Sequence, residues 1–304
     1  MTIHHVFANR SNIGDWLSAK GIQSLLSLKV TEHLCDEPFV PKTLAQLSKA
    51  TAEDFIIIGG GGLFMDYFLP FWKGFRAIAN RVPFCLWGVG YCDLKQIPSK
   101  PPLELLEEIV SKARLSVVRD KLTWEFLKRC ELPPPVACPS TSAPLPIEKG
   151  FGLLHADNYD TVGGDVYEAM DQICQDFAKE TGRVLRKTNN RIEGGRENQL
   201  EHVLLHYSKS DVVVTSALHA CILGLAMGRK VIAVSGDYKV DSFMEAAGLS
   251  RWVCNFDEVK RLPEMLKRIH EQERPSVFIE RTRQKNLEIA QQIKKMILMP
   301  AADQ

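Results

Sequence analysis

The chain has 304 residues, more than one typical domain contains, which predicts two α/β domains of about 130 to 150 residues each. Its 38 basic and 37 acidic residues leave a formal net charge of +1, so it lacks the overall basic field that nucleic-acid or membrane-surface binding usually requires. A hydrophobic content of 45% with 25% charged residues excludes a disordered or fibrous protein.

The first half of the chain alternates short apolar runs with helical patterns. The apolar runs predict strands at Ile3–Ala8, Phe55–Ile58, Pro83–Trp87 and Leu115–Val118. The spacing of apolar residues predicts helices over Asp15–Leu28, Leu103–Lys112 and Thr123–Cys130. Because the runs FIII and FCLW are apolar on both faces, we expect parallel strands that helices cover.

Residues 131–147 are rich in proline and small residues and interrupt this alternation. We therefore expect an N-terminal Rossmann-like domain over residues 1–140 and a C-terminal one over residues 141–304. Strands are predicted in the second half at Phe151–His155, Arg183–Leu185, Asp211–Thr215, Lys230–Val234 and Trp252–Cys254. Helices are predicted at Val166–Glu180, Glu197–Ser208, Ala217–Met227, Asp241–Ala247, Asp257–His270 and Val277–Met296, the last packing back on the first domain.

The eight cysteines form no CxxC pair and show no metal-ligand spacing. We expect reduced thiols in the core, no metal site and a cytoplasmic location. The first residues contain neither a signal peptide pattern nor an apolar span of 18 residues, so no transmembrane segment is expected.

The segment TSALHACILGLAMG, residues 215–228, follows the apolar run DVVV. Taking Ser216 as the N-cap of a helix that ends at Gly228 places His219 at position N3. That position lies at the carboxyl end of a parallel strand, where open α/β sheets bind ligands, and the helix start favours an anion. The dipole disfavours imidazolium in the empty site, whereas a bound phosphate favours it. The alternative is a core histidine bonded to a backbone carbonyl.

Other polar or glycine residues follow the remaining predicted strands. Gly59 to Gly62 end a strand, where a phosphate or sugar can lie against the backbone, although a purely structural turn is the alternative. Arg119 precedes the predicted N-cap Asp120 and either holds an anion or braces the domain through a carboxylate. Further candidates at strand ends are Asn12, Gly14, Asp15, His155 and Lys239. The aromatic residues Tyr67, Phe68, Phe71 and Trp72 either stack on a sugar or belong to the core.

The motifs N-x-G-D at residues 12–15, IIIGGGGLF, GVG, VVRDKLTWEFL and S-x-L-H-A resemble the polysaccharide pyruvyl transferase family over nearly the whole chain. The resemblance implies a GT-B-like fold, in which two Rossmann-like domains with parallel sheets face a cleft. It also implies transfer of pyruvate from phosphoenolpyruvate to two hydroxyls of a saccharide as a ketal, in the biosynthesis of a polysaccharide or cell-surface glycan. The donor is a substrate, and no cofactor is expected.

The resemblance also assigns roles to residues of this chain. His219 corresponds to the signature histidine and is the expected general acid, and Asp15 is the candidate acceptor of a hydroxyl proton. The expected substrate-binding residues are Asn12, Gly14, Gly60, Gly61, Gly62, Arg119, His155, Ser216, Leu218 and Lys239. The expected partner is a saccharide acceptor, free or lipid-linked, and no nucleic acid.

Two positions depart from the family pattern. Some members carry Arg where this chain has Ala217, and many carry Asp-Pro-Ala where it has Cys138-Pro139-Ser140. Either part of the donor-binding charge comes from elsewhere, or the donor differs. Two alternatives stay open from the sequence: a GT-B glycosyltransferase that uses a nucleotide sugar, and a carbohydrate-binding protein without catalytic activity.

Overall fold

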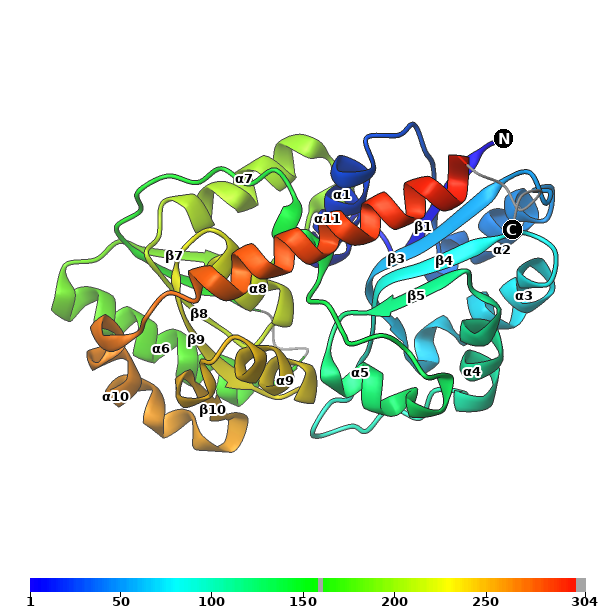
Figure 1. The fold of residues 1–304 in the computed structure, drawn as a ribbon. Coiled ribbons are helices and arrows are strands. Elements are labelled where there is room, and N and C mark those ends of the chain that lie inside the picture. Colours follow the sequence, from blue (N-terminus) through cyan, green and yellow to red (C-terminus); the bar gives the residue numbers. More distant parts are fainter. Residues whose placement is uncertain (158–160, 299–304) are drawn as a thin grey trace.

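The computed structural model describes residues 1–157 and 161–298 and contains two five-stranded sheets, which lie side by side in Figure 1. The first sheet has the order β2-β1-β3-β4-β5 and the second the order β10-β9-β8-β6-β7. Counted within its own half and from the opposite edge, the second order is also 2-1-3-4-5. Neighbouring strands in both sheets are parallel, which confirms the predicted α/β class.

The first sheet and its helices come from residues 3–126. The strands are β1 (Ile3–Phe7), β2 (Thr31–Leu34), β3 (Phe55–Phe64), β4 (Phe84–Tyr91) and β5 (Leu115–Val118), and the helices are α1 (Ile13–Leu26), α2 (Val40–Leu47), α3 (Leu69–Ala79), α4 (Leu103–Lys112) and α5 (Lys121–Phe126). The prediction gave no bounds for β2, α2 or α3. The edge strand β2 has the sequence TEHL and only one buried residue, so it carries no apolar run that a sequence pattern could detect.

The second sheet comes from residues 153–255 and matches the predicted order of elements. Its strands are β6 (Leu153–Ala156), β7 (Leu185–Thr188), β8 (Val212–Thr215), β9 (Lys230–Ser235) and β10 (Val253–Asn255), and the helices are α6 (Gly164–Thr181), α7 (Glu197–Ser208), α8 (Leu218–Ala226), α9 (Tyr238–Ala246), α10 (Leu262–Lys267) and α11 (Ser276–Leu298). Between the sheets, the short 3₁₀ helix Pro139–Ser142 packs on α1, α8 and α11.

The prediction that the glycines end their strands was wrong. β3 continues through Gly59–Gly62 to Phe64, and β4 continues past Trp87, the last residue of the predicted strand, through Gly88 and Gly90 to Tyr91. The two strands stay paired as far as Phe64 and Tyr91, with a change of register after Gly61. Gly60 and Gly61 have φ values of +85° and +104°, so the bulge uses backbone conformations that favour glycine.

Helix α1 belongs to two hydrophobic cores. Its residues Ile13, Trp16 and Leu17 pack with the core of the second sheet, whereas Ile22 and Leu26 pack with the first sheet. The aromatic residues after the glycines are mostly core as well, because Phe68, Phe71 and Trp72 are buried and only Tyr67 is exposed. Stacking of that cluster on a sugar is therefore not supported.

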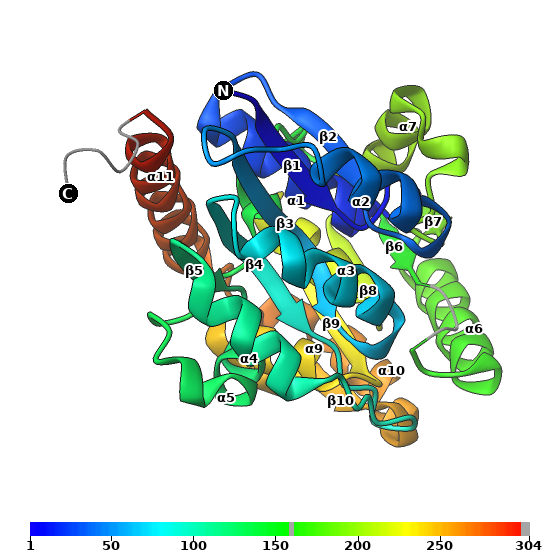
Figure 2. The same ribbon diagram turned by 90° about the vertical axis from the view of Figure 1, so that its right-hand side faces the viewer.

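The final helix α11 crosses both halves of the molecule, as the red and orange helix of Figure 1 and the turned view of Figure 2 show. Its apolar residues Ile289, Ala290, Ile293 and Ile297 complete the core on one face of the first sheet. The buried Trp87 on β4 donates a hydrogen bond of 2.9 Å from Nε1 to Oδ1 of Asn286. α11 thus covers the first sheet on this face together with α1.

Replacing the buried Ile293 with alanine is expected to lower the free energy of unfolding by about 2 to 5 kcal/mol, because the cavity lies in the core that α11 completes. The matched control on the same helix is Leu287→Ala. Leu287 is 37% exposed, so its loss should stay within about 1 kcal/mol. Urea denaturation of both variants measures the difference, and equal losses would contradict this account of α11.

Every helix in residues 1–157 and 161–298 is too short or too polar to span a membrane.

Candidate active site

Loops at the carboxyl ends of the two sheets are joined by backbone hydrogen bonds. The loop after β1 pairs with residues 190–192, where Ile13 N–H donates to Asn190 O at 3.1 Å and Ile192 N–H donates to Ser11 O at 2.7 Å. The loop after β4 pairs with residues 236–238, where Tyr238 N–H donates to Asp93 O at 3.2 Å. Isolated antiparallel bridges, Asn12–Arg191 and Leu94–Asp237, mark the two junctions. The carboxyl edges of both sheets therefore meet.

Ser216 is not the N-cap of α8, as the sequence predicted. The N-cap is Ala217, so His219 stands at N2 and not at N3. The side chain of Ser216 turns back to Asp157, with its N–H and Oγ–H donating to the carboxylate at 2.7 and 2.6 Å. Both polar hydrogens of Ser216 thus brace the ends of β6 and β8. The helix does end as predicted, with Gly228 at φ +71° after the C-cap.

The imidazole of His219 lies at the junction of the two halves. A Cβ added to Gly14, on α1, would stand only 1.8 Å from Nδ1 of His219, so the absence of a side chain there admits the ring. On the other side of the ring, Nε2 lies 3.9 Å from Sγ of Cys138. The residue is half-buried. Burial, followed by the charges of Arg119 and Lys239, holds the pKa of His219 well below its usual value, so the imidazole is neutral.

Asp15 lies in the first turn of α1, directly against β3. The N-cap of this helix is Asn12, whose side chain accepts a hydrogen bond from Gly14 N–H at 2.9 Å. A Cβ on Gly61 would stand 2.2 Å from Oδ1 of Asp15, so this glycine leaves room for the carboxyl group. Burial raises the pKa of Asp15 to about 7, although the nearby Arg119 opposes the shift. Near neutral pH, Asp15 is therefore protonated about half of the time.

Two cations from different halves converge on the thiol of Cys92. Nη2 of Arg119, which follows β5, lies 3.8 Å from Sγ, and Nζ of Lys239, at the start of α9, lies 3.4 Å from it. Both cations also have carboxylate partners, because Nε of Arg119 donates to Asp120 at 3.0 Å and Lys239 pairs with Asp237. Arg119 is buried and Lys239 is half-buried. Two cationic side chains thus come together here, and their N–H groups suit an anion.

The predicted bracing role of Arg119 and its position at the site coexist. Asp120 is the N-cap of α5, as predicted, and accepts from Thr123 N–H at 2.8 Å. The same carboxylate holds the guanidinium, which passes over Gly90, where a Cβ would stand 2.0 Å from Nε. Gly90 therefore makes room for Arg119.

The glycine run of β3 mainly serves packing. A Cβ on Gly60 would stand 2.4 Å from Cβ of Ser18, and Gly61 faces Asp15, so α1 fills the space that a ligand would need beside these two residues. Gly62 differs, because it faces Sγ of Cys92 and the guanidinium of Arg119. Of the predicted glycine contacts with a ligand, only one at Gly62 fits this arrangement.

Gly60→Ala should lower the free energy of unfolding by about 2 to 5 kcal/mol, because a side chain is disfavoured at φ +85° and also overlaps α1. Gly163→Ala is the matched control. Gly163 has nearly the same φ, +84°, but nothing within 4 Å of an added Cβ, so its cost should be only the conformational one of about 1 to 2 kcal/mol. Thermal or urea unfolding compares the two variants. Similar losses of stability would show that α1 shifts at little cost to make room for the added methyl group.

His155 does not join this cluster in the described part of the structure. It is buried on β6, its Nδ1 lies 3.2 Å from Oδ1 of Asp171 on α6, and its ring stacks on Tyr167. Burial lowers its pKa, while Asp171 partly offsets this effect. Leu218 is also a core residue, packed with the second sheet. The structure thus brings together Gly14, Asp15, Gly62, Arg119, His219 and Lys239, but neither His155 nor Leu218.

Sequence reasoning missed two thiols of the cluster, Cys92 and Cys138, which it assigned to the core. Cys92 directly follows β4, so the strand-end rule that selected Arg119 could also have selected it. Cys138 precedes the 3₁₀ helix Pro139–Ser142, where no strand or helix pattern points to the site. Among the described residues, no group of three or more histidine, cysteine or acidic side chains could hold a metal ion.

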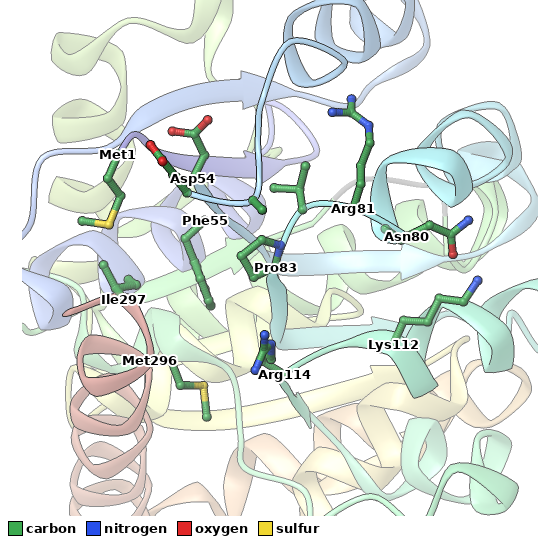
Figure 3. Close-up of a pocket in the computed structure, with 14 residues that line it drawn as sticks. Met1, Asp54, Phe55, Asn80, Arg81, Pro83, Lys112, Arg114, Met296 and Ile297 are labelled. Carbon is green, nitrogen blue, oxygen red and sulfur yellow. The ribbon is translucent and has the colours of Figure 1, made fainter. Parts of the chain in front are cut away.

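A cavity of about 380 Å³ lies elsewhere, at the amino ends of β3, β4 and β5 (Figure 3). Phe55, Pro83, Arg114, Met1 and Met296 are among the residues that line it. Open α/β sheets bind ligands at the carboxyl ends of their strands, and none of the clustered residues lines this cavity. We therefore place the candidate site at the junction of the two sheets.

Comparison with known proteins supports both the family and the fold. The sequence model of the family described as polysaccharide pyruvyl transferase matches residues 7–238. No protein of curated function matches the sequence significantly.

Several solved structures share the arrangement of the two sheets. UDP-GlcNAc 2-epimerase of Methanocaldococcus jannaschii, solved with UDP-GlcNAc and UDP, aligns with a TM-score of 0.56 at 9% identity, over 90% of this chain and 94% of its own. MnaA of S. aureus, solved with UDP, aligns with a TM-score of 0.55 at 13% identity, over 90% of this chain and 92% of its own. The pneumococcal O-GlcNAc transferase GtfA, solved with UDP and GlcNAc, aligns with a TM-score of 0.50 at 12% identity, over 86% of this chain and 60% of its own. The fold is therefore GT-B-like.

Proposed function

Because the chain belongs to the polysaccharide pyruvyl transferase family, we propose that it transfers pyruvate from phosphoenolpyruvate to two hydroxyls of a saccharide, which become bridged as a ketal. The observation that carries this proposal is the convergence of Arg119 and Lys239 on one point, at 3.8 and 3.4 Å from Sγ of Cys92. Beside them lie Asp15 and His219, two groups that can exchange protons. The charges of Arg119 and Lys239 act to lower the pKa of both. An anionic donor and acid–base chemistry fit this combination.

The donor carries a phosphate and a carboxylate, and the site offers a cation from each half of the molecule. Arg119 presents a planar guanidinium, which matches either group through two parallel hydrogen bonds. Lys239 supplies a second positive charge from the start of α9. The first turn of α8 adds N–H groups that favour an anion near His219. A donor held by both halves would keep the two sheets together during the reaction.

The reaction requires one proton to be given and two to be taken. A proton added to C3 of phosphoenolpyruvate leaves an oxocarbenium-like C2, which one saccharide hydroxyl attacks with loss of its proton. Phosphate then leaves, and the second hydroxyl attacks C2, loses its proton and closes the ketal. Atoms balance as donor plus diol giving ketal plus inorganic phosphate.

The protonation of the two groups assigns these roles differently from the sequence-based expectation. Asp15 holds a proton about half of the time near pH 7, and the negative charge of a bound donor would raise its pKa further. His219 is neutral and is suited to accept a proton from a hydroxyl. We therefore propose Asp15 as the general acid and His219 as the general base.

The acceptor and the location rest on indirect support. The acceptor is a saccharide in the biosynthesis of a polysaccharide or cell-surface glycan, free or lipid-linked, as the family implies. All eight cysteines are free and most are buried, which suits a reducing compartment. We propose a cytoplasmic location on this ground.

Phosphoenolpyruvate is expected to raise the melting temperature by a few degrees, because a ligand at 100 times its dissociation constant adds about 2.7 kcal/mol to stability. Lys239→Met should abolish the shift, and Lys267→Met, at an exposed position on α10, should preserve it. A thermal-shift titration with phosphoenolpyruvate and with UDP measures both. Stabilisation by UDP alone would favour a nucleotide-sugar glycosyltransferase, and no shift with millimolar phosphoenolpyruvate would contradict the proposed donor.

A further inference from the structure

A short relay of hydrogen bonds connects α1 with His219 through the thiol of Cys138. Oγ of Ser18 donates to Gly14 O at 2.7 Å and lies 2.8 Å from Sγ of Cys138. The same sulfur lies 3.9 Å from Nε2 of His219. Ser18 and Cys138 are fully buried, so water cannot substitute for either partner. The relay therefore consists of these side chains and one backbone carbonyl.

The direction of each hydrogen bond follows from the number of hydrogens. A serine hydroxyl has one hydrogen, and that of Ser18 goes to Gly14 O, which can only accept. Oγ of Ser18 must then accept from the thiol, so the single hydrogen of Cys138 points to Ser18. Toward His219 the sulfur can only accept, which requires a hydrogen on Nε2. Because the imidazole is neutral, its Nδ1 then carries none.

We propose that Cys138 is a positioning residue, which holds His219 in the tautomer with hydrogen on Nε2 and leaves Nδ1 as the nitrogen that meets the substrate. Within the described part of the chain, Nδ1 has no hydrogen-bond partner, and the half-buried ring lies against the bare backbone of Gly14. The lone pair of Nδ1 is therefore unused among the described residues.

The catalytic meaning of this tautomer depends on the proposed function. An unprotonated Nδ1 can accept the proton of a saccharide hydroxyl but cannot donate one to the donor. For the neutral imidazole, the tautomer thus makes His219 a base and leaves the acid's role to Asp15. When Nδ1 takes up a proton, Nε2–H continues to donate to the sulfur, so the ring keeps its orientation during turnover.

The test reads the tautomer directly in ligand-free protein. Two-bond ¹H–¹⁵N spectra of histidine-labelled protein distinguish a protonated from an unprotonated ring nitrogen, and a His219→Gln sample identifies the signals of His219. The wild type should show only Nε2–H. Cys138→Ser keeps one donor and one acceptor and should preserve this tautomer, whereas Cys138→Ala should give a mixture.

Ser18→Ala gives the sharpest outcome, because removal of the Ser18 acceptor frees the thiol hydrogen to turn toward Nε2. His219 should then shift toward the Nδ1–H tautomer, although neither His219 nor Cys138 has changed. A change that only disturbs packing has no reason to move the proton from one ring nitrogen to the other. Ser18→Ala also removes no backbone hydrogen bond of the helix, so it can test the proposal by itself if Cys138→Ala fails to fold.

Kinetics complete the test. Cys138→Ala should lower kcat about tenfold, the worth of one hydrogen bond to the reacting group, with KM for phosphoenolpyruvate nearly unchanged, and Cys138→Ser should restore kcat. A wild-type His219 with hydrogen on Nδ1, or one tautomer pattern shared by the wild type and all three variants, would overturn the proposal. The predicted tautomers in a protein without pyruvyl transfer would instead refute only the proposed function.

Discussion

Replacing His219 with glutamine is expected to lower turnover about 10²- to 10⁴-fold, the usual worth of general acid–base catalysis, while the protein stays folded. Glutamine retains an N–H donor that can reach toward Cys138, but it cannot accept and hold a proton. Affinity for phosphoenolpyruvate should change little, because the donor's charges are matched by Arg119 and Lys239. Single-turnover ketal formation and calorimetric titration of the donor measure these two quantities separately.

His155→Gln is the matched control for this variant. It removes a second buried imidazole, paired with Asp171 on α6 and apart from the described site residues. It should cost about 1 to 3 kcal/mol of stability, the range for a disturbed buried polar group, and leave turnover nearly unchanged. The opposite pattern, with an active His219→Gln protein of reduced stability, would make His219 a structural residue.

Asp15→Asn should also lower turnover about 10²- to 10⁴-fold, since the amide cannot supply a proton to the donor. In the wild type, kcat/KM should fall as the pH rises above about 7, where Asp15 loses its proton. The variant should lack this limb of the pH profile. Asp165→Asn, in the first turn of α6 and exposed, is the control and should keep both rate and profile. Retention of the limb in Asp15→Asn would assign it to another group.

The same substitution should change the pH dependence of stability. The native protein holds the Asp15 proton up to about pH 7, whereas an unfolded aspartate releases it near pH 3.9. Between these values the native state binds more protons than the unfolded state, so the free energy of unfolding falls as the pH rises. Asp15→Asn should lack this decline and be the more stable protein at pH 8. Urea titrations at several pH values measure it.

The candidate site was accessible to sequence reasoning where a single rule applied. Parallel strands end at one edge of their sheet, so residues in the loops and first helical turns after the strands, such as Asp15, Arg119 and His219, were expected near each other. The structure brings them together. The interpretation of the glycine run was less secure. Both a ligand and a helix can approach bare backbone, and only the position of α1 over Gly60 distinguishes the two.

Other contacts depend on residues that are distant in the sequence. Ser216 satisfied every local requirement of an N-cap, but its hydroxyl bonds to Asp157, 59 positions earlier. Cys138 and Ser18 are 120 positions apart, and nothing near either residue predicts that they meet. Local patterns specify strands and helices, whereas tertiary packing decides which of their polar side chains are free.

Helices α1 and α11 both pack with sheets that are distant from them in the sequence, which affects how the protein folds during synthesis. Ile13, Trp16 and Leu17 leave the ribosome early, but their core partners on the second sheet, such as Leu153 and Val213, follow more than 130 residues later. One face of the first sheet is covered even later, when Ile289 and Ile293 of α11 have been synthesised. A nascent chain that has completed only the first sheet therefore exposes apolar surface on that face. Domains usually fold as units during synthesis, but here the first can close only after the last helix has been translated.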